Sequence, residues 1–445
     1  MAAPAVDFIQ GLGFGDLPEG VVEQARLCLL DLLGVALSGR RTAMSRIACD
    51  HAVEFFGPGR LRSRLLFDGR SASPIGAGFA GAATIDSCDG HDGHALTKGH
   101  AGVAVLPALL ALAEQRPQMS GREFIAALVL GYEIGTRAGI ALHASASDYH
   151  SSGAWNALAA AALAAHLLPL DAQRTREALG IAEYHGPRSP MMRCIDHPTM
   201  VKDGSAWGCL AGLSAGYLAE RGFTGAPAST VEQLQLQDLW GDLGARWRIL
   251  EQYFKPHPVC RWAHPAIDAA LALARQHGLA SGQIRAVRVK TFHHATRLAH
   301  ACPQTTEQAQ YSLQFPVAAA LVHGEVDFAT LDGVGLGDAE VLRLARLMRV
   351  EEWPPYSARF PGERIAEVCV ETADGRCLES GPTRARGDPD LALGAAALRA
   401  NFRHSFAAAS APGLATELED CVSRLGADEA PVAPLLDRVL DKVRV

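Results

Sequence analysis

The sequence predicts a mainly α protein with a large all-helical part and a smaller α+β unit. Ala and Leu, which are good helix formers, are abundant, whereas aromatic residues make up only 6% of the chain. Apolar residues recur at helical spacing up to about residue 265, and period-two alternation appears only beyond it. We therefore expect a helical unit up to about residue 265, a smaller α+β unit over 266–400 and a final helical tail.

The helical domain begins with an amphipathic pattern that follows Pro18. Ser120 and Glu123 have capping-box spacing ahead of FIAALVLGYEIGTRAGIAL, and Ser229 and Glu232 repeat that spacing. Small residues such as Gly212 in the last long segment would let helices approach closely. The pattern predicts long helices over 20–38, 103–115, 124–142, 153–168 and 205–221.

The smaller α+β unit follows a helix expected over 264–277. Residues 284–291 and 365–372 alternate apolar and polar side chains, as half-buried strands do. The second segment continues through the turn Ala-Asp-Gly-Arg into CLES, which predicts a hairpin. Helical patterns over 311–323 and 338–348 lie between the two strands.

Composition excludes several classes of function. At 445 residues the chain is long enough for two structural units, and its formal charge of −7 without a basic cluster argues against nucleic-acid binding. The start lacks a signal-peptide pattern, and apolar stretches such as 103–113 are too short and interrupted to span a bilayer. Ten scattered cysteines without a Cys-x-x-Cys pair indicate a reducing compartment. We expect a cytoplasmic protein without a membrane partner.

The segment IDSCDGHDGHALTKGH, residues 85–100, concentrates the polar chemistry of the helical domain. It combines aspartates, histidines and a lysine with three glycines, so it forms a loop between apolar helices. Burial near a helical core would shift carboxylate and imidazole pKa values, as acid/base catalysis requires. A metal site is an alternative, although the spacing matches no metal motif. A solvated surface loop is the simplest alternative.

Three further segments contain candidate side chains. His150 precedes a buried helix, where the helix dipole would favour a neutral, base-competent imidazole; a capping or core role is an equal alternative. The stretches MRCIDHPTMVKDG and YFKPHPVCRWAH carry cationic groups on proline-stiffened loops, which suits recognition of substrate carboxylates, although structural ion pairs remain the default. No Gly-x-Gly-x-x-Gly after a strand, Walker loop or Gly-x-Ser-x-Gly elbow is present.

These segments, in this order, resemble the MmgE/PrpD family, which includes 2-methylcitrate dehydratase, cis-aconitate decarboxylase and iminodisuccinate epimerase. The matching stretches include LPEGVVEQARLCLLDLLGVALSGR, AATIDSCDGH with GHAGVAVLPALLALAE, YHSSGAWNALAAAALAAHLLPLD, KPHPVCRWAHPAIDAAL and RFPGERIAEVCVETADG. The resemblance covers nearly the whole chain. It implies a large all-helical domain over 1–265, completed by the C-terminal tail 401–445, and a smaller α+β lid domain over 266–400. It also implies an active site in the cleft between them, homodimers, and no organic cofactor or metal.

The resemblance also implies roles for individual residues. Asp86 matches the family's loop aspartate, His100 the histidine before the Leu-Pro-Ala helix, and His150 the histidine before the helix at 153. Lys202 matches the family's active-site lysine. These four are the expected catalytic residues. Arg193, Lys255, Cys260 and His264 are the expected substrate-binding residues.

Departures from the decarboxylase pattern narrow the range of reactions that we expect. The loop up to His100 is longer than in the decarboxylase and brings in His91, Asp92 and His94. Cys260 stands where the decarboxylase has a histidine, and Phe315 where it has a tyrosine. We therefore expect a lyase of a small di- or tricarboxylate, similar to 2-methylcitrate dehydratase. An epimerase, a cis-aconitate-type decarboxylase, a metal-dependent hydrolase and a non-catalytic binding protein remain alternatives.

Overall fold

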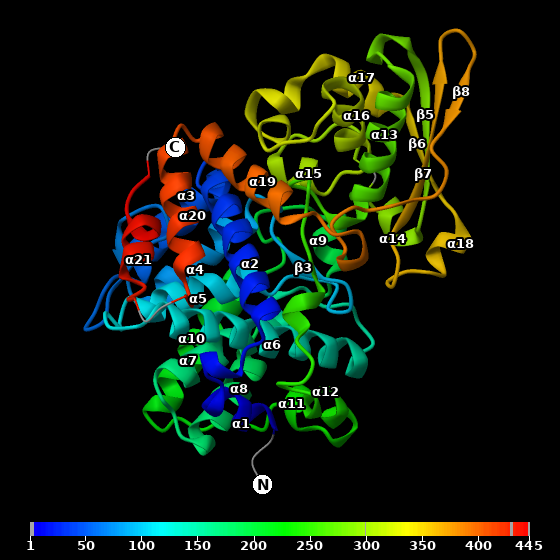
Figure 1. Cartoon of the computed structure of the whole chain (residues 1–445). Helices are drawn as coiled ribbons and strands as arrows, with labels where there is room; N and C mark the ends of the chain where they lie inside the picture. Colours follow the sequence, from blue (N-terminus) through cyan, green and yellow to red (C-terminus); the bar gives the residue numbers. More distant parts are fainter. Residues whose placement is uncertain (1–3, 299, 428–429, 444–445) are drawn as a thin grey trace. The chain divides into compact units, whose positions relative to one another are not determined.

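The computed structural model describes residues 4–298, 300–427 and 430–443, and it confirms a mainly α protein. The chain forms two compact units, each of which contains more than one segment (Figure 1). The first unit comprises the chain up to Met191, Asp203–Tyr253 and the chain from Gly394 onward. The second comprises Met192–Lys202 and Phe254–Leu393.

Helices build almost all of the first unit. The sequence-predicted long helices are present, with ends within a few residues of those expected. Its helices are α1 (Pro4–Gly11), α2 (Glu19–Gly39), α3 (Ala43–Phe55), α4 (Pro74–Asp86), α5 (Gly102–Ala113), α6 (Gly121–Ser145), α7 (Gly153–Leu167), α8 (Ala172–His185), α10 (Ser205–Glu220), α11 (Ser229–Glu232), α12 (Gln237–Gly241), α19 (Ala395–Ala408), α20 (Pro412–Arg424) and α21 (Ala433–Leu440).

The first unit is not entirely helical, which corrects the expectation. Two short antiparallel ladders join β1 (Ser63–Arg64) to β2 (Ser71–Ala72) and β3 (Gly93–His94) to β4 (Gln252–Tyr253). Two residues are too few to show a period-two pattern, so sequence periodicity could not predict them.

Small residues bring α7 and α10 into close contact, as predicted. A Cβ atom added at Gly212 would lie 2.2 Å from the backbone oxygen of Ala157, and one added at Gly208 would lie 2.4 Å from that of Gly153. Only glycine permits this approach of the two backbones.

One predicted helix cap forms and the other does not. The Ser120 hydroxyl accepts a hydrogen bond from the Glu123 backbone, and the Glu123 carboxylate accepts one from the Ser120 backbone. The Ser229–Glu232 prediction is wrong, because Ser229 is the first residue of α11 and Ala228 occupies the cap position.

Helix α6 is the one helix of the described residues that is long and apolar enough to cross a membrane. The sequence analysis did not single it out. Its most apolar window is 94% buried inside the protein, as in the core helix of a globular protein. This helix is therefore weak evidence for a membrane span.

The second unit contains a five-stranded mixed sheet and its helices. Strand β5 (Ile284–Thr291) lies between β6 (Met348–Glu352), which is parallel to it, and β7 (Ile365–Thr372), which is antiparallel. Strands β8 (Cys377–Glu379) and β9 (Thr383–Arg384) both pair with β7. The helices are α9 (Met192–Asp196), α13 (His264–His277), α14 (His293–Thr296), α15 (Thr306–Gln310), α16 (Gln314–His323), α17 (Ala339–Leu347) and α18 (Pro354–Ser357).

The predicted strands 284–291 and 365–372 have the bounds of β5 and β7. Strand β6 was missed, because the sequence MRVEE directly continues the amphipathic pattern of α17. Its outer residues are exposed, so only its pairing with β5 identifies it as a strand.

The residue boundaries of the two compact units differ from those expected for the two domains. Pairing of β4 with β3 keeps Gln252 and Tyr253 in the first unit, whereas Phe254 donates its backbone hydrogen bond to Gly387 of the second. Residues 192–202 also belong to the second unit, where Arg297 binds Asp196 at 2.6 Å. Long-range polar contacts of this kind leave no trace in local periodicity.

Candidate active site

The loop between α4 and α5, residues 87–101, is buried rather than solvated. His91 and Asp92 are fully buried, and Asp86 and His94 are 2% exposed. The surface-loop interpretation of this segment is therefore wrong. Burial of so many ionisable groups is costly unless they are hydrogen-bonded or used for function.

The loop brings Asp86, His91 and His100 together. The Asp86 carboxylate, at the end of α4, lies 4.0 Å from Nε2 of His91. The His91 ring makes an edge contact with the His100 ring, with centroids 4.4 Å apart. Thus Asp86 reaches His100 by way of His91, which the sequence analysis counted only as an extra loop residue.

A backbone contact sets the tautomer of His100. Nδ1 of His100 lies 2.5 Å from the carbonyl oxygen of Asp92, so Nδ1 carries the proton and donates it to that carbonyl. The lone pair is therefore on Nε2, which is the nitrogen that can accept a proton from a substrate.

Buried side chains hold both ends of the loop. The Tyr132 hydroxyl donates to the Asp92 carboxylate, and the Asp92 backbone donates to Asp31 at 3.1 Å. At the other end, the His100 backbone donates to the Ser152 hydroxyl at 3.1 Å. Ser152 in turn donates to the Asp203 carboxylate at 2.7 Å, so His100 has a fixed backbone as well as a fixed tautomer.

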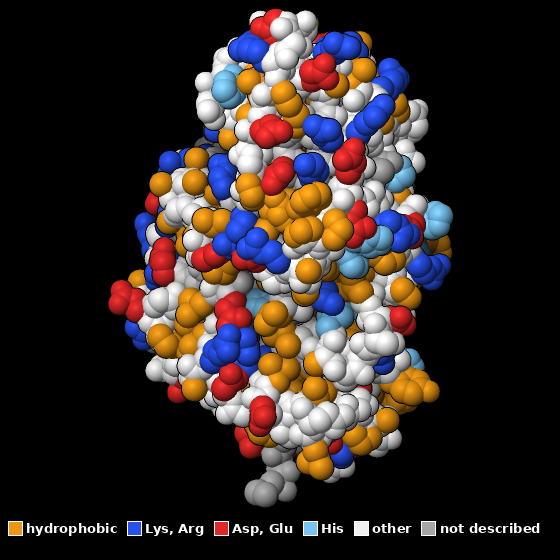
Figure 2. All heavy atoms as spheres, turned by 90° about the vertical axis from the view of Figure 1, so that its right-hand side faces the viewer, with side chains coloured by type: hydrophobic (Ala, Val, Ile, Leu, Met, Phe, Trp, Pro, Cys, Tyr) orange, Lys and Arg blue, Asp and Glu red, His pale blue; other side chains and the backbone are white. Residues whose placement is uncertain are grey.

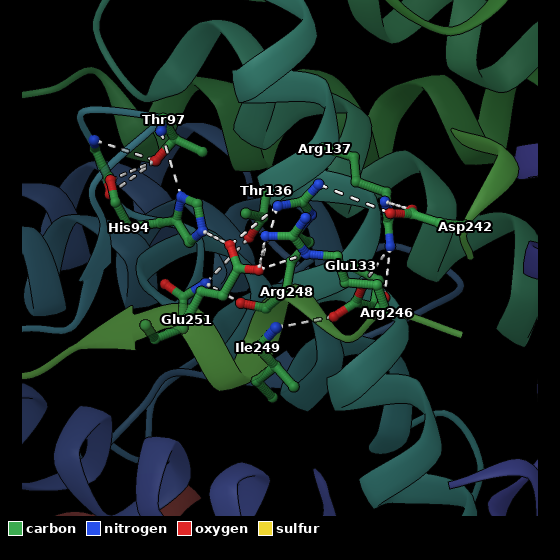
Figure 3. Close-up of polar contacts among 12 residues, drawn as sticks. His94, Thr97, Glu133, Thr136, Arg137, Asp242, Arg246, Arg248, Ile249 and Glu251 are labelled. Carbon is green, nitrogen blue, oxygen red and sulfur yellow. Dashed lines mark hydrogen bonds and ion pairs between the residues drawn. The ribbon is translucent and has the colours of Figure 1, made fainter. Parts of the chain in front are cut away.

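A charged network holds the middle of the loop (Figure 3). His94 Nε2 lies 3.0 Å from Glu251, which also accepts hydrogen bonds from Arg246 at 2.8 Å and from Arg248 at 3.1 Å. Partial burial alone would raise the pKa of Glu251, but the hydrogen bonds from His94, Arg246 and Arg248 outweigh it and lower the pKa to about 2. Glu251 is therefore a permanently charged anchor for His94.

The same network continues to a buried carboxyl on α6. Glu133 is fully buried, accepts a hydrogen bond from the Ile249 backbone at 2.9 Å and lies 3.3 Å from Arg137 (Figure 3). Burial raises the pKa of Glu133 to about 7, although Arg137 and Arg248 oppose the shift. Arg137 also binds Asp242, which completes the connection from α6 to the segment before β4.

Left-handed backbone conformations coincide with the candidate segments. Among the described residues, five non-glycine residues have positive φ, and Asp89, Lys98 and Lys202 are three of them, at 49°, 53° and 50°. Such conformations cost about 1–3 kcal/mol each and cluster at functional sites. The coincidence supports both the 85–100 loop and Lys202 as functional.

His150 lies two residues before the N-cap of α7 and is 8% exposed. Its Nδ1 lies 2.9 Å from the Asp148 carbonyl, so its lone pair is also on Nε2. Its backbone donates to Nε2 of His143 at 3.2 Å. Burial, aided by Lys98 and by His150 itself, lowers the pKa of His143 to about 4, so His143 is a neutral acceptor near pH 7.

In the second unit, Lys202 is 2% exposed and has a defined orientation. Its ammonium donates to the side chain of Gln310 at 2.6 Å and lies 4.6 Å from the Tyr311 ring centroid. The Gln310 backbone carbonyl accepts a hydrogen bond from Cys260 at 2.9 Å. Gln310 thus connects Lys202 to the 254–264 segment, a role for which the sequence offers no signal.

The 254–264 segment buries Lys255, Cys260 and His264. The His264 ring lies 3.1 Å from the Val259 carbonyl and 3.3 Å from the Arg261 guanidinium. Burial, followed by the charges of Arg261, His257 and Lys255, lowers the pKa of His264 well below its usual range. His264 is therefore a neutral ring with internal partners, and its role as a substrate contact stays a prediction.

An aspartate orders the cations around this segment. Asp268 of α13 accepts hydrogen bonds from His257 at 3.3 Å and from Arg386 at 2.9 Å. Burial alone would raise the pKa of Asp268, but these two partners outweigh burial and lower it. Arg261 binds Asp388 at 2.7 Å, so it has a structural partner.

The remaining predicted positions differ in their surroundings. Arg193 lies on α9 with an exposed side chain, so the structure adds no support for its binding role. Phe315 is fully buried near the start of α16, and its backbone donates to the Ser312 hydroxyl. The substrate-binding role of Arg193 stays a prediction.

Two groups of described side chains could hold a metal ion. The donor atoms of Asp89, His91 and His100 lie within 4.8 Å of one another, and all three residues are buried. Cys369, Cys377 and Glu379 form a second group on the sheet of the other unit. The first group contains His100, so a metal ion there would compete with proton transfer by that residue.

Sequence reasoning missed the residues that position the candidate catalytic groups. Ser152 and Asp203 lie within segments that it flagged, but it assigned them no role. Tyr132, Glu251 and Gln310 come from distant parts of the chain, and only the fold brings them next to the candidate catalytic residues.

The surface charge of the protein is mixed in sign. The face shown in Figure 2 has acidic and basic side chains interspersed, without a single-sign patch on that face.

Comparisons with known proteins agree with this arrangement of segments. The MmgE/PrpD N-terminal domain model matches residues 5–238, and the MmgE/PrpD C-terminal domain model matches residues 257–424. Cis-aconitate decarboxylase of Aspergillus terreus is 24% identical over 86% of this chain and 82% of its own length. Human cis-aconitate decarboxylase is 27% identical over 82% of this chain and 79% of its own length. The cis-aconitate decarboxylase-like protein oryM of Aspergillus oryzae is 26% identical over 88% of each chain. The chain belongs to the MmgE/PrpD family.

Proposed function

We propose that this protein is a lyase that acts on a small di- or tricarboxylate by proton transfer at a carbon next to a carboxylate. The observation that carries the proposal is His100, which has a fixed tautomer with Nε2 as its basic nitrogen in a buried loop. Family membership supports the same reaction class, because its named relatives are decarboxylases of a tricarboxylate.

In the proposed mechanism, Nε2 of His100 or His150 takes the carbon-bound proton. Asp86 stabilises the resulting imidazolium of His100 through His91, which lies between them. Lys202 and Lys255 bind substrate carboxylates, and their charge stabilises the enolate-like intermediate. Every step uses side chains of this chain, so the mechanism calls for no organic cofactor.

We place dehydration, as in 2-methylcitrate dehydratase, first among the possible reactions. Proton removal would then be followed by loss of hydroxide from the neighbouring carbon. Decarboxylation is the second candidate, because the relatives reported above carry that activity in their names. Cys260 and Phe315 depart from the decarboxylase pattern, which is why decarboxylation comes second. Epimerisation would need a second proton donor, for which His150 is available.

The test is an NMR assay of the purified protein in deuterated water with 2-methylcitrate, citrate, cis-aconitate and iminodisuccinate. Loss of water, loss of carbon dioxide or exchange of a carbon-bound proton would each identify one reaction. We expect His100→Gln to abolish the signal, and His277→Gln, on the exposed end of α13, to leave it unchanged. Silence of the wild type with all four substrates would refute the proposed substrate class.

Two alternatives are tested with the same preparation. Elemental analysis checks the metal-dependent hydrolase, which requires about one metal ion per chain. Substrate binding without turnover would support a non-catalytic binding protein. A cytoplasmic location and a homodimer stay part of the proposal, and light scattering of the purified protein tests the homodimer.

A further inference from the structure

Two cysteines approach each other on the β7–β8 hairpin, and neither is among the residues assigned to catalysis. Cys369 pairs with Glu379 and Cys377 pairs with Glu371, so the two cysteines are diagonal neighbours on one face of the sheet. Their Sγ atoms lie 2.7 Å apart, although both cysteines are free thiols in the structure. Side chains placed in this way need little movement to form a covalent bond.

The two thiols differ in access to solvent. Cys377 is exposed at the start of β8, and Cys369 is half-buried between the packed residues Val368 and Val370 of β7. Strand β8 pairs only with β7 among the described strands, so it forms an edge of the sheet. A dissolved disulfide reagent would therefore reach Cys377 first.

A neighbouring cation favours the thiolate form, which is the reactive form. Arg288 of β5 is opposite Cys369 in the sheet register, and its guanidinium lies 3.8 Å from the Cys369 sulfur. Burial raises the pKa of Cys369, the neighbouring Cys377 thiol adds to that shift, and Arg288 acts against it. The positive charge of Arg288 also disfavours a metal cation at Cys369, Cys377 and Glu379, so the contact favours oxidation over metal binding.

We propose that Cys369 and Cys377 are a redox modification site that forms a reversible intramolecular disulfide. The oxidant is a small disulfide of the glutathione class. The Cys377 thiolate attacks one sulfur of glutathione disulfide and releases one glutathione thiolate, which leaves a mixed disulfide on Cys377. The Cys369 thiolate then attacks the Cys377 sulfur and releases the second glutathione. The protein loses two electrons and two protons, and glutathione disulfide becomes two glutathione thiols.

The sequence makes this bond easy to detect. Arg376 lies between the two cysteines, so trypsin separates IAEVCVETADGR from CLESGPTR. Only a disulfide keeps these two peptides together after digestion. The test does not use catalytic activity, so its outcome does not depend on the proposed lyase function.

The experiment equilibrates the purified full-length protein in glutathione buffers of increasing oxidation, blocks remaining thiols and digests with trypsin. We expect the linked peptide pair to appear before Cys302 is modified, although Cys302 is also exposed, and to disappear after reduction. Cys302→Ser should keep the link. Cys369→Ser should instead accumulate the mixed disulfide on Cys377, because the Cys369 thiol that displaces the glutathione intramolecularly is then missing.

Three results would overturn the proposal. One is the absence of the linked peptides in fully oxidising buffer. Another is a stable mixed disulfide on Cys377 of the wild type, which would show that Cys369 does not displace glutathione. The third is stoichiometric Zn²⁺ binding that Cys377→Ser abolishes and that prevents oxidation of the wild type. That result would assign the two thiols to a metal site.

Discussion

Replacing Glu251 by Gln tests the anchor of the candidate catalytic loop. The carboxylate of Glu251 contacts His94, Arg246 and Arg248, and its pKa falls from 4.5 to about 2. Each pKa unit corresponds to about 1.4 kcal/mol, so the full shift would correspond to roughly 3 kcal/mol of stability. The side chain is 27% exposed and solvent screens its contacts, so we expect Glu251→Gln to cost about 1–2 kcal/mol at pH 7.

The sign of the pH dependence follows from the lowered pKa. The unfolded state takes up a proton at higher pH than the folded state, so the stabilisation is complete above pH 4.5 and is lost as pH falls towards 2. Urea unfolding of the wild type and of Glu251→Gln at pH 7 and pH 3 measures this stabilisation. Replacement of the exposed Glu54 by Gln is the control. A difference below about 0.5 kcal/mol between Glu251→Gln and Glu54→Gln at pH 7 would refute the role of Glu251 as an anchor.

Three further predictions address other parts of the two units. His100→Asn should lower kcat roughly 10²–10⁴-fold with little change in the unfolding midpoint, and near-normal turnover on the substrate identified by NMR would remove His100 from the mechanism. For Glu133, the raised pKa means that the folded state holds a proton that the unfolded state releases between pH 4.5 and about 7, so unfolding free energy should fall over that range. Glu133→Gln should flatten that fall in urea titrations, and an unchanged slope would contradict the assignment. Asp268→Asn should cost about 2 kcal/mol in urea unfolding at pH 7, because it removes the buried carboxylate that accepts hydrogen bonds from His257 and from the exposed Arg386, and a loss under about 0.5 kcal/mol would contradict this.

Local patterns predicted most elements because their signals lie within the elements themselves. The strand 284–291 could be identified from alternation alone, and the Ser120–Glu123 cap from two residues at fixed spacing. Strand β6 and the two-residue ladder of β3 and β4 could not, because they depend on partners far away in the chain. For the same reason, the segment 192–202 could not be assigned to the second compact unit from periodicity.

For the candidate site, the sequence identified the reactive residue types but not their partners. Asp86, His100 and Lys202 were found from a polar segment between apolar helices and from the family resemblance. The contact of Asp86 with His91 is a product of loop geometry. Gln310 is 108 positions away from Lys202, and a glutamine at the end of a short helix gives no indication that it orients a lysine.

The partners of the two candidate bases constrain the chemistry they can perform. Both His100 and His150 use Nδ1 to contact a backbone carbonyl, so both present Nε2 as the basic nitrogen. A carbonyl fixes the tautomer but carries no net charge, so it stabilises an imidazolium less than a carboxylate does. His100 also has carboxylates within reach, because the donor atoms of Asp89, His91 and His100 lie within 4.8 Å of one another and His91 contacts Asp86. We therefore propose that His100 is the group that holds the proton after abstraction.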